Sequence, residues 1–427
     1  MIMKEDFLHY IFKKHLWLDN PVQLTDGRRI EIIDTGQHNH DSGPDFFNAK
    51  IKIDNTIWVG NIEIHINSSD WYKHKHDEDP AYSNVILHIV YKHDKPVFTK
   101  HRTEIPVWEM TFPQIIFNKF EEFRLSENQI PCTDYRDLIE KEIFNIHIEK
   151  MGIERLEYKS EFINELLIKS NNDWEYAFYV NLVRSFGAGV NSDAFEQLAI
   201  NTPLKILRKY SDNLFKLEAI LFGQSGLLEV ANLDEYVIKL KTEYNFLRKM
   251  HDLSPISATN WKFSKMRPSN LPHIKIAQFA SMMTFFHGLF TAVINEPDYT
   301  ILKKTFKIKV SEYWTKHYSF GKITNKTMSG FGNTAFETIL INTVAPFIFV
   351  FNKDKISEDS QSKHYMLLNS LKPEDNREVR LWKIFGVRPS NAFETQALLH
   401  LKKNYCDKRK CLKCSIGQHI MQQINNL

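Results

Sequence analysis

Two carboxylates flank the first strand of a predicted hairpin near the start of the chain, namely Asp45 and Glu63. Two segments in which apolar and polar residues alternate, 48–53 and 56–65, are joined by the turn-prone pair Asp54-Asn55. This pattern predicts a β-hairpin. Because the hairpin would bring both carboxylates to neighbouring strands, we expect them to bind a hard divalent cation, Mg²⁺ or Mn²⁺. Such a site suits metal-dependent phosphodiester cleavage.

This arrangement resembles the PD-(D/E)XK nuclease superfamily, in which Pro-Asp precedes a hairpin whose second strand carries Asp/Glu-X-Lys. The matching residues are Pro44, Asp45 and Glu63, with His65 in place of the lysine. The resemblance covers roughly residues 30–92 and implies a nuclease whose catalytic residues are the two carboxylates and His65. A histidine here can bind metal or serve as a general base near neutral pH. The alternative is that Asp45 caps a turn and Glu63 is an ordinary strand residue.

Histidines are concentrated near the N-terminus, where ten of the eighteen fall within the first 101 residues. Two pairs, His38-X-His40 and His74-X-His76, have a spacing that places both rings on one side of a strand or turn. Imidazole is a common ligand of Zn²⁺, Fe and Mn²⁺. A His/carboxylate metallohydrolase acting on a small molecule is therefore an alternative function. The candidate ligands of this metal are Asp45, Glu63, His40, His74 and His76.

Cysteine spacing predicts a second, structural metal site. Three of the four cysteines form the motif Cys406-X₄-Cys411-X₂-Cys414, and the fourth is Cys132. In a cytoplasmic protein such spacing favours metal binding over disulfides. Four thiolates suit Zn²⁺ or an iron–sulfur cluster. If Cys132 joins the other three, the site ties the start of the helical region to its end; the alternative is free thiols.

Basic side chains in three segments are candidates for contact with DNA or RNA phosphates. Lys50 and Lys52, on the first hairpin strand, could also replace the lysine of the nuclease motif, whose position is occupied by His65. Segment 261–270 interleaves aromatic and basic residues, which suits stacking on single strands but is equally typical of a surface loop. The formal net charge of +3 permits a nucleic-acid partner without requiring one. The candidates are Lys50, Lys52, Lys262, Lys265, Arg267, Lys408 and Arg409.

The elements that must position these residues change in type after residue 112. Residues 1–112 carry strand signals, including the apolar run 83–91, in which we expect His88 to be a hydrogen-bonded core residue, and an edge strand at 104–110. Residues 113–427 show helical periodicity. We therefore predict an α+β protein with a mixed-sheet, nuclease-like domain over 1–112 and an all-α domain over 113–427. The predicted helices are 142–167, 174–186, 214–222, 233–250, 274–294, 335–351 and 392–404.

Composition and hydropathy favour a globular cytoplasmic protein. The chain has 43% hydrophobic and 25% charged residues, as soluble globular proteins do. The first residues lead into an amphipathic helix and carry no secretory signal. The longest apolar stretch, 338–351, is interrupted by Asn342 and Pro346, and we expect it to be too short to span a bilayer. No membrane partner is predicted, and the oligomeric state is left open.

Nearly the full length of the chain also resembles an uncharacterised bacterial family known only as a domain of unknown function. This resemblance implies the layout of the chain but no activity. The leading hypothesis is a metal-dependent nuclease or related phosphodiesterase, and the first alternative is a non-catalytic nucleic-acid-binding or scaffold protein with a structural cysteine site. The segments that carry the resemblance are 41–46, 60–65, 69–71, 74–76, 85–90, 267–270 and 405–417.

Overall fold

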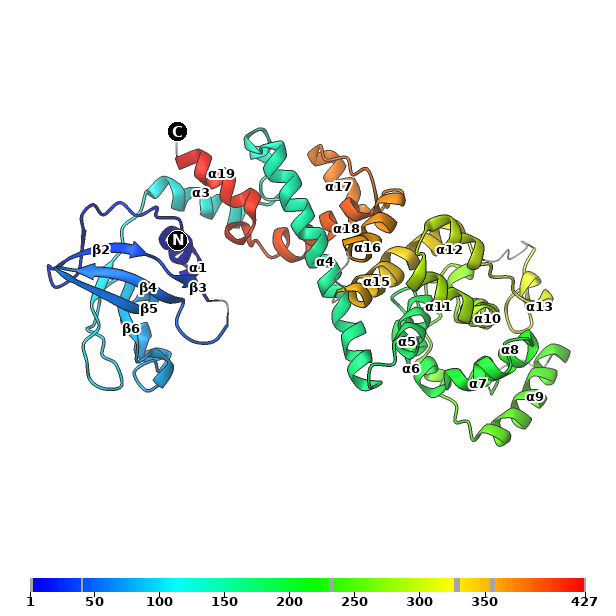
Figure 1. Cartoon of the computed structure of the whole chain (residues 1–427). Helices are drawn as coiled ribbons and strands as arrows, with labels where there is room; N and C mark the ends of the chain where they lie inside the picture. Colours follow the sequence, from blue (N-terminus) through cyan, green and yellow to red (C-terminus); the bar gives the residue numbers. More distant parts are fainter. Residues whose placement is uncertain (1–2, 40, 230–233, 326–330, 354–357, 426–427) are drawn as a thin grey trace. The chain divides into compact units, whose positions relative to one another are not determined.

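The computed structural model describes residues 3–39, 41–229, 234–325, 331–353 and 358–425 (Figure 1). Strands come first and helices follow, so the α+β fold class is confirmed. The chain forms two compact units. The sheet unit comprises Met1–His147 and Leu401–Leu427, and the helical unit comprises Ile148–His400. The change from strands to helices near residue 112 therefore lies inside the sheet unit.

A seven-stranded mixed sheet forms the centre of the sheet unit, in the order β1-β2-β4-β5-β6-β7, with β3 also paired to β4. Neighbouring strands are antiparallel from β1 to β5, whereas β6 is parallel to β5 and to β7. The edge position expected for the last strand is thereby confirmed. The strands are β1 (Val22–Gln23), β2 (Arg29–Asp34), β3 (Gln37–His38), β4 (Phe46–Ile53), β5 (Thr56–Asn67), β6 (Val85–Lys92) and β7 (Val107–Glu109).

The predicted hairpin is the pair β4 and β5. Its turn includes Asp54 at φ 54°, in the left-handed region that Asp tolerates better than most residues. Alternation along β5 buries Ile62 and Ile64 on the face covered by helix α1 (Glu5–Lys13), which Figure 1 shows against the sheet. Glu63 and His65 consequently lie on the opposite face, where the short helix α2 (Asp70–Lys73) follows the strand.

Both ends of the chain contribute to the sheet unit. After the sheet come helices that lead toward the helical unit, and the last elements return at residue 401. Helix α19 packs beside α3, as Figure 1 shows, and the short helix η7 contacts α1 and α3. These elements are η1 (Pro80–Tyr82), α3 (Gln114–Leu125), η2 (Thr133–Leu138), α4 (Lys141–Lys169, shared with the helical unit), η6 (Lys402–Cys406), η7 (Cys411–Lys413) and α19 (Ser415–Asn425).

The helical unit packs its helices around one large apolar core. The seven segments predicted as helices from periodicity are helical in the structure. For the predicted segment 233–250, this applies from residue 234 onward, because residue 233 lies outside the described residues. The segment 274–294 is two helices bent by 75°, because Phe285 leaves helical geometry at φ −130° and ψ 12°. The unit contains α5 (Trp174–Phe186), α6 (Ser192–Asn201), α7 (Leu204–Lys209), α8 (Leu214–Gln224), α9 (Glu235–His251), η3 (Ala258–Asn260), η4 (Pro268–Asn270), α10 (Pro272–Met283), α11 (Phe286–Asn295), α12 (Tyr299–Thr305), α13 (Glu312–Lys316), β8 (His317–Ser319), β9 (Lys322–Ile323), α14 (Asn333–Ile339), η5 (Leu340–Val344), α15 (Ala345–Asn352), α16 (Glu358–Ser370), α17 (Arg377–Phe385) and α18 (Ala392–Leu401, shared with the sheet unit).

The longest apolar stretch lies within a continuous helical run, Asn333–Asn352, of 20 residues. By length and composition this run could cross a membrane, so the expectation that it is too short is wrong. The flanking residues 333–337 extend the helix beyond the apolar stretch itself. Phe336, Leu340 and Phe347 pack in the core of the helical unit, and a buried core helix satisfies the same criteria as a membrane span.

Candidate functional site

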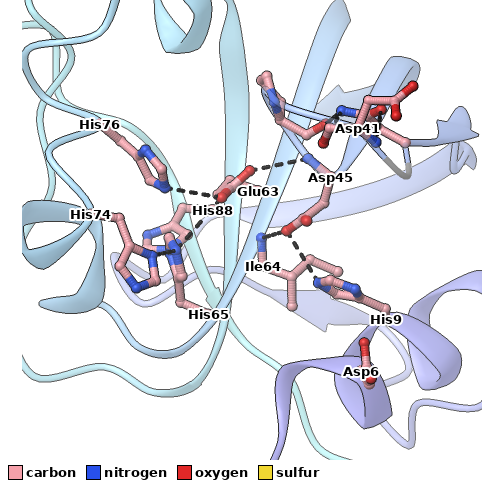
Figure 2. Close-up of polar contacts among 12 residues, drawn as sticks. Asp6, His9, Asp41, Asp45, Glu63, Ile64, His65, His74, His76 and His88 are labelled. Atoms are coloured by element: carbon pink, nitrogen blue, oxygen red, sulfur yellow. Dashed lines mark hydrogen bonds and ion pairs between the residues drawn. The ribbon is translucent and has the colours of Figure 1, made fainter. Parts of the chain in front are cut away.

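Glu63 is the centre of a group of polar side chains on the face of the sheet opposite α1. It is 5% exposed. One carboxylate oxygen, Oε2, accepts a hydrogen bond from the backbone N–H of Asp45 at 3.1 Å. The other, Oε1, lies 3.2 Å from His76 Nε2 and 3.5 Å from His65 Nε2 (Figure 2). Glu63 therefore connects the start of β4 with two imidazoles.

The imidazoles also contact one another. His65 Nε2 lies 3.0 Å from His74 Nδ1, and His65 Nδ1 lies 2.9 Å from His88 Nε2. The loop after α2 turns back over the sheet and thereby places His74 and His76 beside β5. One nitrogen from each of His65, His74 and His76 falls within 4.8 Å of the others. The predicted pair His74-X-His76 thus meets the predicted Glu63-X-His65 motif.

The three imidazoles form the group whose spacing suits one metal ion, and Glu63 lies beside it. Ligand atoms at about 2.0–2.1 Å from a tetrahedral ion lie about 3.3 Å from one another. Three contacts are close to this length: His65 Nε2–His74 Nδ1 at 3.0 Å, His76 Nε2–Glu63 Oε1 at 3.2 Å and His65 Nε2–Glu63 Oε1 at 3.5 Å. Among the described residues, the group whose ligand atoms all lie within 4.8 Å of one another contains the three histidines without Glu63. His88 would then hold the ring of His65 through its other nitrogen, as outer partners of metal-bound histidines do. His88 is 0% exposed, which confirms the expected hydrogen-bonded core residue.

Burial and crowding shift the acid–base properties of the group in opposite directions. Burial, followed by the charge of Asp45, raises the pKa of the Glu63 carboxyl to about 9. Burial, followed by the neighbouring imidazoles, lowers the pKa of His65 to about 2. Both shifts disfavour charge at the site when no cation is bound. A divalent cation reverses this preference for the carboxylate and coordinates the neutral imidazoles directly.

Asp45 is close to Glu63, but its carboxylate has different partners. Asp45 Oδ2 accepts a hydrogen bond from the backbone N–H of Ile64 at 2.9 Å and lies 3.2 Å from His9 Nε2 (Figure 2). Burial acts to lower the pKa of His9, but the hydrogen bond and charge of Asp45 outweigh it, so the pKa of His9 is raised. His9 was not among the predicted residues, because an isolated histidine in an amphipathic helix gives no sequence signal.

The remaining predicted residues occupy several places. His40 lies outside the described residues. Lys50 pairs with Val59 on the face that carries Glu63, and the four residues from Val59 to Glu63 correspond to about 13 Å along the strand. Lys50 is therefore too far along the sheet to replace the motif lysine, and Lys52 lies further still. The others are in the loop before η4 of the helical unit (Lys262, Lys265, Arg267) and beside the cysteines of the sheet unit (Lys408, Arg409).

All four cysteines belong to the sheet unit. Cys132 precedes η2, whereas the other three lie in or beside η6 and η7. Burial, and then the neighbouring Cys414 and Cys411, raises the pKa of the Cys132 thiol to about 12. The early cysteine and the C-terminal motif are thus neighbours in space.

Comparison with known proteins gives one match. A family model described as "Protein of unknown function (DUF2851)" matches residues 5–377, which include the hairpin, the histidines and most of the helical unit. No curated protein and no solved structure matches the chain.

Proposed function

The chain belongs to the family described as "Protein of unknown function (DUF2851)", and we propose that it is a metal-dependent phosphodiesterase that cleaves nucleic acid. The observation that carries the proposal is the contact of Glu63 with His65 and His76, extended to His74, beside the Asp45 carboxylate. The resemblance of Pro44-Asp45 and Glu63-X-His65 to a nuclease motif supports the same function. The β4–β5 hairpin places Asp45 at the start of β4 and Glu63 on the neighbouring strand β5.

The ligand types bear on the identity of the metal. The proposed set contains one carboxylate and three imidazoles, and imidazole suits Mn²⁺, Zn²⁺ or Fe better than Mg²⁺. Of the two metals expected at the carboxylates, Mn²⁺ is therefore the better fit to these side chains. A bound divalent ion would lower the pKa of a water ligand and offset the negative charge that develops on the phosphate.

The surrounding residues have separate proposed roles. His65 is a ligand rather than a general base, because both of its ring nitrogens are engaged by other side chains. His74 is exposed and marks the side from which a substrate enters. Asp45 and His9 hold β4, β5 and α1 together beside the site. Lys50, on the same face of the sheet, would contact a phosphate away from the cleaved bond.

A small-molecule hydrolase is the second candidate, and the burial of the site favours it. Glu63 is 5% and His65 is 2% exposed, so a substrate must reach them past His74. A compact phosphodiester can do this more easily than a polymer. A non-catalytic nucleic-acid-binding or scaffold protein is the third candidate, and it predicts binding without turnover.

The test is cleavage by the purified full-length chain after removal of metal and readdition of Mn²⁺, Zn²⁺ or Mg²⁺. Substrates are labelled single- and double-stranded DNA and RNA, with bis(p-nitrophenyl) phosphate as the small phosphodiester. We compare Glu63→Gln with Glu31→Gln, which alters an exposed carboxylate on β2 of the same sheet. We expect Mn²⁺-dependent cleavage of nucleic acid that Glu63→Gln abolishes and Glu31→Gln preserves.

Three results would contradict the proposal. Cleavage that persists in Glu63→Gln would remove this carboxylate from the mechanism. Turnover of the small phosphodiester alone would favour the small-molecule hydrolase. No turnover of any substrate, with metal bound in the wild type, would favour the non-catalytic protein.

A further inference from the structure

The four cysteines are held at the ends of structural elements in the sheet unit. Cys132 is the residue before η2, Cys406 ends η6, Cys411 begins η7, and Cys414 is the residue before α19. Helix α19 contacts both η2 and η7, and η6 contacts η7. The fold therefore brings residue 132 together with a segment that lies more than 270 residues later in the chain.

Two contacts, at Gly417 and at Arg409, fix the conformation of the loop between these elements. A Cβ atom at Gly417 would lie 2.2 Å from the backbone oxygen of Cys411, so only glycine allows α19 to approach this closely. Arg409 donates a hydrogen bond through Nη2 to the backbone oxygen of Ser126 at 2.6 Å. This contact fastens the cysteine loop to the segment that leads to Cys132. Arg409 thus has a structural partner, although it was predicted as a nucleic-acid contact.

The thiols are largely withdrawn from solvent and influence one another. Cys406 and Cys414 are each 8% exposed. Burial, and then the nearby Cys414, raises the pKa of the Cys411 thiol to about 12. The pKa of Cys406 is raised well above its usual value by burial and then by Cys414, Cys132 and Cys411. Two buried and two half-buried thiols thus lie near one another, an arrangement that suits thiolates bound to a metal.

A fifth side chain of ligand type reaches this group. His147, near the start of α4, is 1% exposed, and its Nε2 lies 3.3 Å from Cys414 Sγ. Sequence spacing gave no indication of His147, since it is far from both parts of the cysteine motif. An imidazole N–H at this distance can donate a hydrogen bond to a thiolate that is already bound to metal.

Four cysteine thiolates are the ligand set of two kinds of metal group. One zinc ion binds four thiolates at about 2.3 Å each. An iron–sulfur cluster binds them through its iron atoms, with sulfide between the irons.

From this arrangement we propose that Cys132, Cys406, Cys411 and Cys414 bind a metal group as thiolates, either one zinc ion or an iron–sulfur cluster, with His147 donating a hydrogen bond to the Cys414 thiolate. The metal group ties the C-terminal segment 401–425 to the part of the sheet unit that follows the sheet. It is independent of the proposed phosphodiesterase site, because none of its ligands belongs to the Glu63 group.

The experiment uses full-length protein purified without oxygen. Iron, acid-labile sulfide and zinc are measured per chain, together with the visible absorption spectrum, on wild type, Cys411→Ser and Glu63→Gln. We expect either one zinc ion per chain, or iron and sulfide in equal amounts with a broad visible absorption, at these cysteines. Cys411→Ser should lose this metal group, and Glu63→Gln should keep it.

A wild type that holds neither zinc nor iron would overturn the proposal, and so would a metal content that Cys411→Ser leaves unchanged. Sulfide in the wild type distinguishes a cluster from a zinc ion. Zinc that is lost in Glu63→Gln but kept in Cys411→Ser would assign it to the Glu63 group and overturn the cysteine site. The metal content of the wild type decides first, whether or not Cys411→Ser folds. The test is also separate from the phosphodiesterase test, since metal content is measured without turnover.

Discussion

The two units bury titratable side chains in different ways. In the sheet unit, Glu63 and His65 contact each other and further imidazoles. In the helical unit, Glu218 and His273 are buried singly, whereas His400 is buried beside one carboxylate, that of Glu154 at 3.3 Å. Glu218 accepts a hydrogen bond from the Tyr236 hydroxyl at 2.6 Å, and His273 packs against rings such as that of Phe320.

This difference separates structural burial from a candidate site. A single buried carboxyl or imidazole can remain neutral and be satisfied by one hydrogen bond or by packing. Several such groups in mutual contact repel one another when charged and gain from a shared cation. The Glu63 group of the sheet unit is therefore the candidate site, whereas Glu218 and His273 are parts of the core of the helical unit.

The largest effect is expected when one buried histidine of each unit is replaced by alanine. His65→Ala should lower the Mn²⁺-dependent cleavage rate by at least about 100-fold, because it removes a proposed metal ligand. His273→Ala should leave the rate nearly unchanged but lower the free energy of unfolding by about 2–4 kcal/mol, since it leaves a cavity among aromatic rings. Rates and urea unfolding of both variants are measured side by side. Equal losses of activity would remove the distinction between the units.

An intermediate effect is expected at Glu218, whose pKa burial raises to about 7. In the unfolded chain this carboxyl ionises near its ordinary pKa of 4.5, so the free energy of unfolding falls as the pH rises from about 4.5 to about 7 and is then constant. Glu218→Gln should remove this loss, with a gain of at most about 3 kcal/mol at pH 8 and almost none at pH 4. Urea unfolding at several pH values measures it. A variant that is less stable than wild type at pH 8 would show that the carboxylate is needed.

The smallest effect is expected at Lys50, which lies on the site's face of the sheet but away from the site. Lys50→Ala should raise the KM for nucleic acid a few-fold, leave kcat unchanged and lower the salt dependence of binding by about one phosphate contact. Lys205→Ala, an exposed change in α7 of the helical unit, is the control. Equal changes of KM and of salt dependence in both variants would show that phosphate binding is not specific to this face of the sheet.

Local sequence patterns predicted most of the architecture. Alternation and the Asp54-Asn55 turn located the hairpin, and periodicity of three and four located the seven predicted helical segments, whereas helices such as α3, α17 and α19 were not predicted. The errors occurred where a distant contact or a single residue decides the outcome. Phe285 ends one helix and starts another, and the run Asn333–Asn352 is longer than its apolar part. Neither effect has a local signature.

The candidate site was predicted in part. Glu63, His65, His74 and His76 were named from a short motif and a histidine pair, and the fold brings them into contact. The partner of Asp45 was not predictable, because α1 supplies His9 through the packing of a helix on the sheet.

The sequence by itself determined the hairpin, the two carboxylates, the histidine pairs and the spacing of three cysteines. These depend on neighbours within a few residues, where backbone geometry relates spacing to direction. Only the tertiary structure decided that the Asp45 carboxylate turns toward Ile64 and His9, and that Cys132 and His147 join the C-terminal cysteines. These contacts join elements that are distant in the chain, and the packing of whole elements against one another sets them.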